Sequence, residues 1–176
     1  MSNEALKTAS QKRRQSTLFI CQAGIIAALY VALTFVFAPI SFGAVQVRIA
    51  EALTILPIFT PAAIPGLFVG CLIGNFLGGG IILDIIFGSI ATLLGAIGTY
   101  LLRKKNPIFG TIPPIVANTL IVPFVIKYAY ANETALPLIM LMILGGEVLS
   151  CGVLGGMLGL SLKKTKLAFS KEKKEK

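Results

Sequence analysis

The chain has 176 residues, of which 56% are hydrophobic and only 13% are charged, and its formal net charge is +9. This composition argues against a soluble domain and indicates an integral membrane protein. The positive charge does not indicate nucleic-acid binding, because the Lys and Arg residues lie mostly beside apolar segments, where such residues contact anionic lipid. We therefore expect membrane lipid, and not nucleic acid, around the basic clusters.

Six apolar segments predict six membrane-spanning helices. Their expected ranges, in chain order, are residues 18–38, 48–58, 62–77, 81–102, 107–126 and 135–162. The first is uncharged and long enough to cross a bilayer of about 30 Å. Prolines and glycines separate the others. The second and third segments are short, so a single span with a re-entrant piece is an alternative there.

Three basic clusters set the expected topology. They lie in residues 1–17, at Arg103-Lys104-Lys105 and in residues 163–176. Because basic residues mark the cytoplasmic side, all three clusters are expected there. The chain then divides into a cytoplasmic tail (1–17), a membrane domain (18–162) and a second cytoplasmic tail (163–176). The predicted fold class is an all-α integral membrane protein, a six-helix bundle with both termini in the cytoplasm.

Arg48 and Glu51 are the charges that most need an explanation, because charges inside an apolar stretch are costly. Three residues apart on a helix, they lie on one face, where they can pair or hold the same ligand. The simplest interpretation is an ion pair at a helix end, at the membrane interface. A functional interpretation is favoured because further polar residues occur in the later apolar segments, namely Asn75, Asp84, Asn118 and Glu147.

All six residues fall in the outer half or the middle of the predicted spans, at about 1.5 Å per helical residue. This convergence predicts one outward-facing pocket. Three carboxylates against one guanidinium favour a donor-rich or cationic ligand, and a carboxylate can accept two adjacent N–H groups of a guanine-like edge. Phe42 is available to stack on an aromatic ring. As alternatives, the acids are protonated or paired with Arg48, and the amides bond helix to helix.

Catalytic and metal-binding motifs are missing from the sequence. The chain has no His, and Cys21, Cys71 and Cys151 lie far apart in apolar segments, so we interpret them as small buried hydrophobic residues. There is no Gly-x-x-x-x-Gly-Lys-Ser/Thr motif, so ATP hydrolysis by this chain is not expected. We therefore predict transport or binding, with no catalytic residue, no metal and no cofactor bound by this chain.

Four stretches carry a resemblance to a known family. They are Ala38-Pro-Ile-Ser-Phe-Gly, Gln46-Val-Arg-Ile-Ala-Glu-Ala-Leu-Thr54, Phe59-Thr-Pro-Ala-Ala-Ile-Pro-Gly66 and Asp84-Ile-Ile-Phe-Gly-Ser-Ile-Ala-Thr-Leu-Leu94. In these stretches the chain resembles the QueT family, over roughly residues 18–162. Members of that family are described as substrate-binding (S) components of energy-coupling factor transporters for queuosine precursors.

The resemblance implies a multi-pass S component in a prokaryotic plasma membrane that binds a 7-deazaguanine, such as 7-aminomethyl-7-deazaguanine or queuine, at the outer face. It implies partners: a transmembrane T component and two cytoplasmic ATPases, which use the ATP. The loaded bundle then topples to release substrate inside. Ala28 and Ala32 match the Ala-x-x-x-Ala pattern by which S components meet the T component. The residue inventory and the resemblance together give the expected substrate-binding residues: Phe42, Gln46, Arg48, Glu51, Asn75, Asp84, Asn118 and Glu147.

Two other functions are open at this point. One is an S component for another vitamin or nucleobase, because one bundle serves different ligands by changing a few pocket residues. Acidic ligands such as biotin fit poorly with three carboxylates. The other is a small intramembrane enzyme or an assembly subunit.

Overall fold

The computed structural model describes residues 3–41, 47–129 and 133–172, and it describes side chains within residues 10–165 of those ranges. All regular secondary structure in the described ranges is helical, and no strand occurs there. The prediction of an all-α protein is therefore confirmed.

The helices follow one another along the chain with short connections. In order they are α1 (Asn3–Val36), α2 (Ala38–Ser41), η1 (Ile49–Ile58), α3 (Ala63–Leu77), α4 (Ile82–Leu101), α5 (Pro107–Gly110), α6 (Ile112–Ala129), α7 (Leu136–Glu147), η2 (Val148–Gly155) and α8 (Gly156–Glu172). α7, η2 and α8 form one continuous helical segment. Between α3 and α4 the chain turns at Gly79, whose φ of +77° is a conformation that favours glycine.

Four helical segments are long and apolar enough to cross a membrane. They are Ser10–Val36, Ile82–Leu101, Pro107–Ala129 and Leu136–Thr165. They correspond to the first, fourth, fifth and sixth predicted spans. The second and third correspond to two shorter apolar helices, Ile49–Ile58 and Ala63–Leu77. All six helical segments thus lie where the sequence predicted them, while the number of complete spans stays a prediction.

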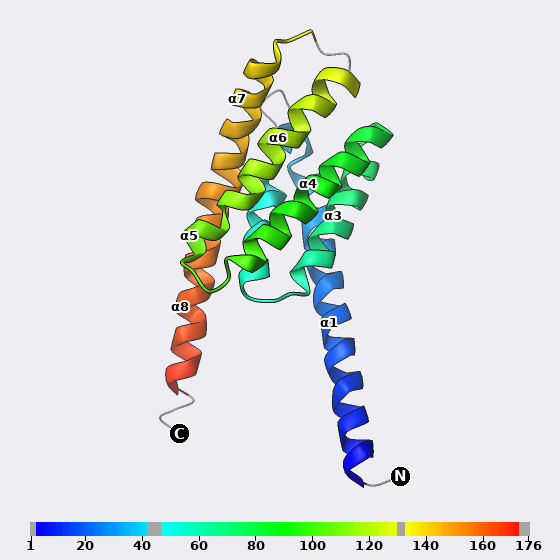
Figure 1. Ribbon diagram of the computed structural model, residues 1–176, viewed down its shortest axis with the longest axis vertical. Coiled ribbons are helices and arrows are strands. Elements are labelled where there is room, and N and C mark those ends of the chain that lie inside the picture. Colours follow the sequence, from blue (N-terminus) through cyan, green and yellow to red (C-terminus); the bar gives the residue numbers. More distant parts are fainter. Residues whose placement is uncertain (1–2, 42–46, 130–132, 173–176) are drawn as a thin grey trace.

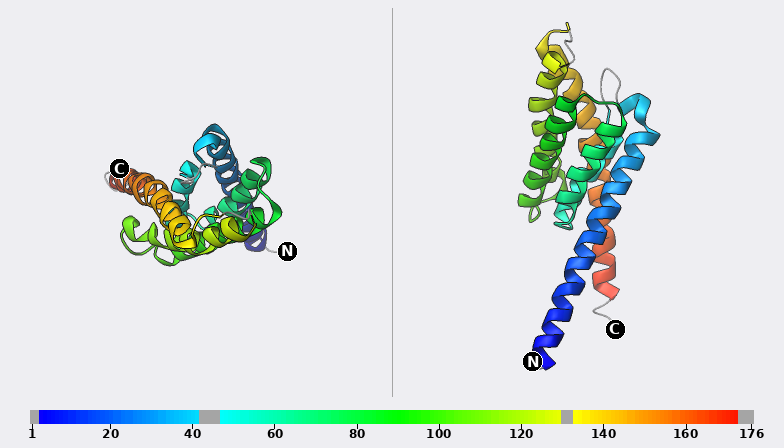
Figure 2. Two further views of the ribbon diagram at one scale, coloured as in Figure 1. Left: turned by 90° about the horizontal axis from the view of Figure 1, so that it is seen from above. Right: turned by 90° about the vertical axis from the view of Figure 1, so that its right-hand side faces the viewer.

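The helices pack into a ring-like bundle, seen from above in Figure 2. α1 contacts α3, α3 contacts α4, α4 contacts α6, and α6 contacts α7. η1 completes the ring, because it contacts η2 as well as α1, α3 and α4. α1 and α8 extend beyond the bundle at the same end, where both termini lie (Figure 1). The basic connection between α4 and α5, Arg103 to Lys105, lies at that end too (Figure 1).

α1 and α3 approach each other closely because α3 has glycines at every fourth position, Gly66, Gly70 and Gly74. A Cβ on Gly66 would lie 2.7 Å from the carbonyl oxygen of Ala23, and a Cβ on Gly70 would lie 2.8 Å from Cβ of Tyr30. Small residues at this spacing let helix backbones come together in membranes. The close contact brings the tyrosine of α1 into the centre of the bundle.

We expect Gly70→Ala to destabilise the chain by about 1–3 kcal/mol, the usual cost of overpacking. The added Cβ would lie 2.8 Å from Cβ of Tyr30 and 3.0 Å from the carbonyl oxygen of Ala27, so α1 and α3 must move apart. Gly145→Ala is the matched control, because nothing lies within 4 Å of a Cβ at that position. Thermal unfolding of both variants in one detergent measures the difference. Equal midpoints would contradict the close approach of α1 and α3.

The prediction that all three cysteines are buried is wrong for Cys21. Cys71 and Cys151 are buried, but Cys21 is exposed. α1 buries mainly the face that packs on α3, which includes Ile26 and Tyr30. At 3.6 residues per turn, Cys21 lies roughly on the opposite side of the helix. Apolar composition alone does not say which face of a membrane helix is turned toward the protein.

Candidate functional site

A cluster of polar side chains lies in the interior of the bundle. Its members come from α1, η1 and the residue before it, α3, α4, α6 and the junction of α7 with η2, and none is more than 6% exposed. We call it the polar cluster, and it consists of Tyr30, Arg48, Glu51, Thr54, Cys71, Asn75, Asp84, Thr92, Asn118, Glu147 and Cys151. Buried polar groups are costly unless they find partners, so their contacts indicate what the cluster is built to do.

Glu51 lies at the centre of this cluster and is fully buried. Its Oε1 atom accepts a hydrogen bond from the hydroxyl of Tyr30 and another, at 3.1 Å, from the hydroxyl of Thr92. One carboxylate oxygen therefore connects η1 to α1 and to α4. The second oxygen, Oε2, is buried and has no hydrogen-bond partner among the described residues.

Glu147 lies beside Glu51, although the two are far apart in the sequence. The amide of Asn118 donates to Glu147 Oε1 at 3.0 Å, and the thiol of Cys151 donates to Glu147 Oε2 at 3.1 Å. The same thiol lies 3.4 Å from the backbone oxygen of Glu51 and 3.4 Å from the hydroxyl of Thr54. One carboxylate oxygen from each acid and the sulfur of Cys151 all lie within 4.8 Å of one another. This arrangement brings two acidic side chains and a thiol together in the interior of the bundle.

Arg48 belongs to another part of the polar cluster, which surrounds Gly88 of α4. A Cβ on Gly88 would lie 3.0 Å from Nδ2 of Asn75, 3.6 Å from Oδ1 of Asp84 and 3.9 Å from Nη1 of Arg48. The missing side chain at Gly88 thus leaves room for three polar groups to meet. Arg48 also interacts electrostatically with Asp84 and with Glu51.

Cys71 links the two groups of contacts just described. Its sulfur accepts a hydrogen bond from Nδ2 of Asn75 at 3.5 Å and lies 3.3 Å from the hydroxyl oxygen of Thr92. Since the same hydroxyl lies 3.1 Å from Glu51 Oε1, the contacts run from Asn75 through Cys71 and Thr92 to Glu51. The polar cluster is therefore one connected group of side chains.

Two irregular helices hold the two central acids. η1 is a 3-10 helix of ten residues, although 3-10 runs longer than three or four residues are uncommon. Residues three apart eclipse in this helix type, so Glu51 and Thr54 lie on one side. η2, which follows Glu147, is a π-helix, and it packs against η1 closely enough that a Cβ on Gly155 would lie 3.2 Å from the backbone oxygen of Ala52. π-helical segments occur frequently at functional sites.

Six of the eight residues predicted to bind substrate meet in the polar cluster. They are Arg48, Glu51, Asn75, Asp84, Asn118 and Glu147. The other two, Phe42 and Gln46, lie outside the described residues. The two residues predicted to meet a partner, Ala28 and Ala32, are exposed on α1.

Sequence reasoning missed five members of the cluster. They are Tyr30, Thr54, Cys71, Thr92 and Cys151. The two cysteines are buried as predicted, but they also form hydrogen bonds with polar side chains. Only Tyr30 carried a signal that could have been used, because a tyrosine in the middle of a span needs a hydrogen-bond partner.

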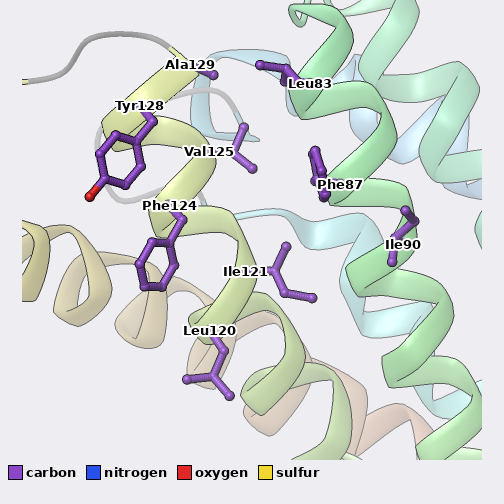
Figure 3. Close-up of a pocket in the computed structure, with 9 residues that line it drawn as sticks. All are labelled: Leu83, Phe87, Ile90, Leu120, Ile121, Phe124, Val125, Tyr128 and Ala129. Atoms are coloured by element: carbon purple, nitrogen blue, oxygen red, sulfur yellow. The ribbon is translucent and has the colours of Figure 1, made fainter.

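A separate apolar cavity of about 560 Å³ lies between α4 and α6. Its lining includes Phe87 and Ile90 of α4 and Leu120, Ile121 and Phe124 of α6 (Figure 3). No member of the polar cluster lines it. Its apolar lining offers no polar group to orient a ligand, so we do not assign the function of the chain to it.

The sequence of the chain is similar to a known protein family and to a curated protein. A family model described as QueT transporter matches residues 20–164. A curated relative named "Queuosine precursor transporter QueT", from Lactococcus lactis subsp. cremoris (strain MG1363), is 36% identical over 84 residues. That match covers 47% of this chain and 49% of the relative, about half the length of each. No solved structure matches the chain. Because the family model spans most of its length, the chain belongs to the QueT transporter family.

Proposed function

We propose that this chain is the substrate-binding component of an energy-coupling factor importer for a queuosine precursor. One observation carries the proposal: within a multi-pass membrane protein of the QueT transporter family, polar side chains from all parts of the bundle meet in one buried cluster. Ionisable residues within transmembrane segments are rare and mark substrate or ion pathways, so they indicate a functional site.

The chemistry of the polar cluster fits a 7-deazaguanine. Such a ligand has adjacent N–H donors on its pyrimidine ring, and a carboxylate accepts two parallel hydrogen bonds from such a pair. The cluster offers three carboxylates, Glu51, Asp84 and Glu147, and two amides, Asn75 and Asn118. The amides supply both donors and acceptors, which suits the carbonyl of the ligand. Queuine and 7-aminomethyl-7-deazaguanine are both candidates.

The proposed topology has six spans with both termini in the cytoplasm. Both ends of the chain and the basic connection Arg103 to Lys105 lie at one end of the bundle (Figure 1). Since Lys and Arg concentrate on the cytoplasmic side, this end is assigned to the cytoplasm. η1 and α3 then act as the second and third spans, and both are shorter than the other four.

The proposed partners are a transmembrane T component and two ATPases, which supply the energy from ATP. The surface that meets the T component is assigned to the outer face of α1, around Ala28 and Ala32. Both alanines are exposed, and a Cβ on Gly24, one turn earlier, would meet nothing within 4 Å. Small exposed residues at this spacing allow another helix to pack closely. The bundle then topples in the membrane to release its ligand inside.

Isothermal titration of the purified chain in detergent tests the binding function. We expect 7-aminomethyl-7-deazaguanine or queuine to bind with a Kd of about 1 μM or tighter, a free energy near −8 kcal/mol. Guanine should bind more weakly, and biotin should not bind, because its carboxylate meets three others. Binding of another vitamin with no response to either deazaguanine would redirect the assignment to a different ligand.

A further inference from the structure

The apolar cavity between α4 and α6 is open toward the surroundings of the bundle. Side chains that line it from both helices, such as Phe87 of α4 and Phe124 of α6, are exposed. Both helices also belong to segments that are long and apolar enough to cross a membrane. In a multi-pass membrane protein such a cavity is open to lipid hydrocarbon and not to water.

The two helices that form this cavity are in close contact at one end and separate at the other. A Cβ on Gly95 of α4 would lie 2.7 Å from Cα of Pro114, and a Cβ on Gly98 would lie 2.5 Å from Cβ of Pro113. The cavity occupies the other half, where its lining lies within residues 83–90 of α4 and 120–129 of α6. α4 and α6 therefore form a wedge that opens toward the end of the bundle away from both termini (Figure 1).

The length of the cavity matches one leaflet of a bilayer. α6 rises about 13 Å from Leu120 to Ala129, at about 1.5 Å per residue. One leaflet of a hydrocarbon core of about 30 Å has a thickness of about 15 Å. The lining begins next to the first residue of α4, Ile82, and reaches the last residue of α6, Ala129. The cavity thus lies within a single leaflet, which is the outer one in the proposed topology.

A cation and an exposed aromatic residue lie at the open end of the cavity. Nζ of Lys127 donates to the backbone oxygen of Thr134 at 3.0 Å, which holds the ammonium beside the connection between α6 and α7. The next residue, Tyr128, lines the cavity, and its exposed ring stacks on that of Phe124. Tyrosine is enriched at the level of lipid headgroups, and lysine attracts anionic ones. This end of the cavity therefore suits a negatively charged headgroup.

We propose that the cavity between α4 and α6 binds one acyl chain of an anionic phospholipid, whose headgroup lies at Lys127. An apolar space that stays empty loses dispersion contacts, and water does not fill it, whereas a hydrocarbon chain does. An acyl chain fits better than a helix of a partner, because a membrane-spanning helix needs contacts through both leaflets and the cavity is confined to one. The site is separate from the polar cluster and shares no residue with it.

Fluorescence quenching tests the proposal directly, because the chain has no Trp and a single introduced Trp serves as the reporter. Phe87→Trp places the reporter in the wall of the cavity. Phe76→Trp is the matched control on α3, outside the cavity. Phe76 is 67% exposed against 44% for Phe87, so simple exposure to lipid predicts earlier quenching of the control.

Phosphatidylglycerol with brominated acyl chains is titrated into both full-length chains in detergent. The Phe87→Trp chain should reach half-maximal quenching at a lipid concentration about tenfold lower than the Phe76→Trp chain. Phe124→Trp repeats the measurement from the wall formed by α6. Equal half-maximal concentrations for the cavity reporters and the control would overturn the proposal. So would loss of the quenching when the proposed T component is added, because a helix of the partner would then occupy the cavity.

Filling the cavity should displace the lipid. In the Phe87→Trp chain, Ile121→Phe adds a ring from the α6 wall and should raise the half-maximal concentration about tenfold, the effect of displacing roughly two methylenes. Ile97→Phe is the matched control, because this residue is exposed on α4 outside the cavity. An Ile121→Phe chain that unfolds at the temperature of its control but is quenched at an unchanged lipid concentration would overturn the proposal.

The headgroup is tested with two lipids that carry the same brominated chains. Phosphatidylglycerol should bind the Phe87→Trp chain about fivefold tighter than zwitterionic phosphatidylcholine, the effect of one lysine near an anionic headgroup. Lys127→Gln should remove this difference. Equal affinity for the two lipids before that substitution would overturn the assignment of an anionic headgroup to Lys127.

Discussion

Arg48→Met is expected to destabilise the detergent-solubilised chain by about 3–5 kcal/mol, the cost of leaving buried charge uncompensated. Arg48 is only 6% exposed, and it is the one buried cation among the described side chains. It lies near Asp84 and interacts electrostatically with that residue and with Glu51. Methionine fills a similar volume but carries no charge, so the carboxylates are left to repel one another.

A matched control and a rescue variant separate charge from packing. Arg103→Met removes an exposed arginine that lies 4.0 Å above the ring of Tyr100, and it should cost less than about 1 kcal/mol. In the double variant Arg48→Met/Asp84→Asn, removing one carboxylate should recover part of the lost stability. Thermal unfolding and denaturation by SDS measure both effects. Strictly additive losses for the two substitutions would contradict the coupling of Arg48 to Asp84.

The acids of the candidate site could be identified from the sequence because of the cost of charge in a membrane. Glu51 and Glu147 interrupt apolar segments, and no ordinary lipid-facing position explains them. Their mutual position could not be identified in the same way. The sulfur of Cys151 lies 3.4 Å from the backbone oxygen of Glu51 across a separation of 100 residues. Such a contact depends on how η1 and η2 pack, which no local pattern specifies.

The hydroxyl members of the cluster could not be recognised from the sequence for a different reason. Threonine and serine in helices commonly bond to the backbone one turn earlier. Thr34 does so with the carbonyl of Tyr30, and Ser89 does so with that of Ile85. The hydroxyl of Thr92 lies 3.2 Å from the carbonyl oxygen of Gly88, but it also lies 3.1 Å from Glu51 Oε1, which can accept its proton instead. In the sequence the three residues look alike, and only the packing of α4 against η1 separates them.

The type of each helix was also beyond sequence reasoning. The segment Ile49–Ile58 is apolar on nearly all sides, so its hydrophobic pattern carries no period to distinguish an α-helix from a 3-10 helix. The π-helix at Val148–Gly155 is likewise apolar, with glycines and no proline. The predicted boundaries were close because prolines and glycines mark them.

Small residues spaced by four show how one pattern serves two purposes. Gly66, Gly70 and Gly74 face α1 inside the bundle, and a Cβ on each would lie within 3.4 Å of an atom in α1. Ala28 and Ala32 have the same spacing but are exposed. The spacing predicts close helix packing in both cases. Only the structure shows which helix packs against each set of small residues. No helix of the described chain covers the two alanines.

The proposed partner surface makes the second strong prediction. Trp in place of Ala28 and Ala32 together should reduce ATP-dependent uptake of the queuosine precursor by about tenfold or more in vesicles that contain the T component and both ATPases, because bulky side chains prevent close helix packing. Ligand binding to the isolated chain should stay within about threefold, since neither alanine belongs to the polar cluster and the added rings point away from the bundle.

Val116→Trp is the matched control, because this residue is 48% exposed on α6, a different helix of the bundle. It adds the same ring to a face that the proposed T component does not cover, so uptake should be retained. The comparison distinguishes a docking surface from a general sensitivity of membrane helices to tryptophan. Full uptake by the variant with Trp at positions 28 and 32 would show that the partner surface does not lie on this face of α1. Loss of ligand binding in that variant would instead show that the outer face of α1 supports the polar cluster through Tyr30, which projects from the opposite side of the same helix.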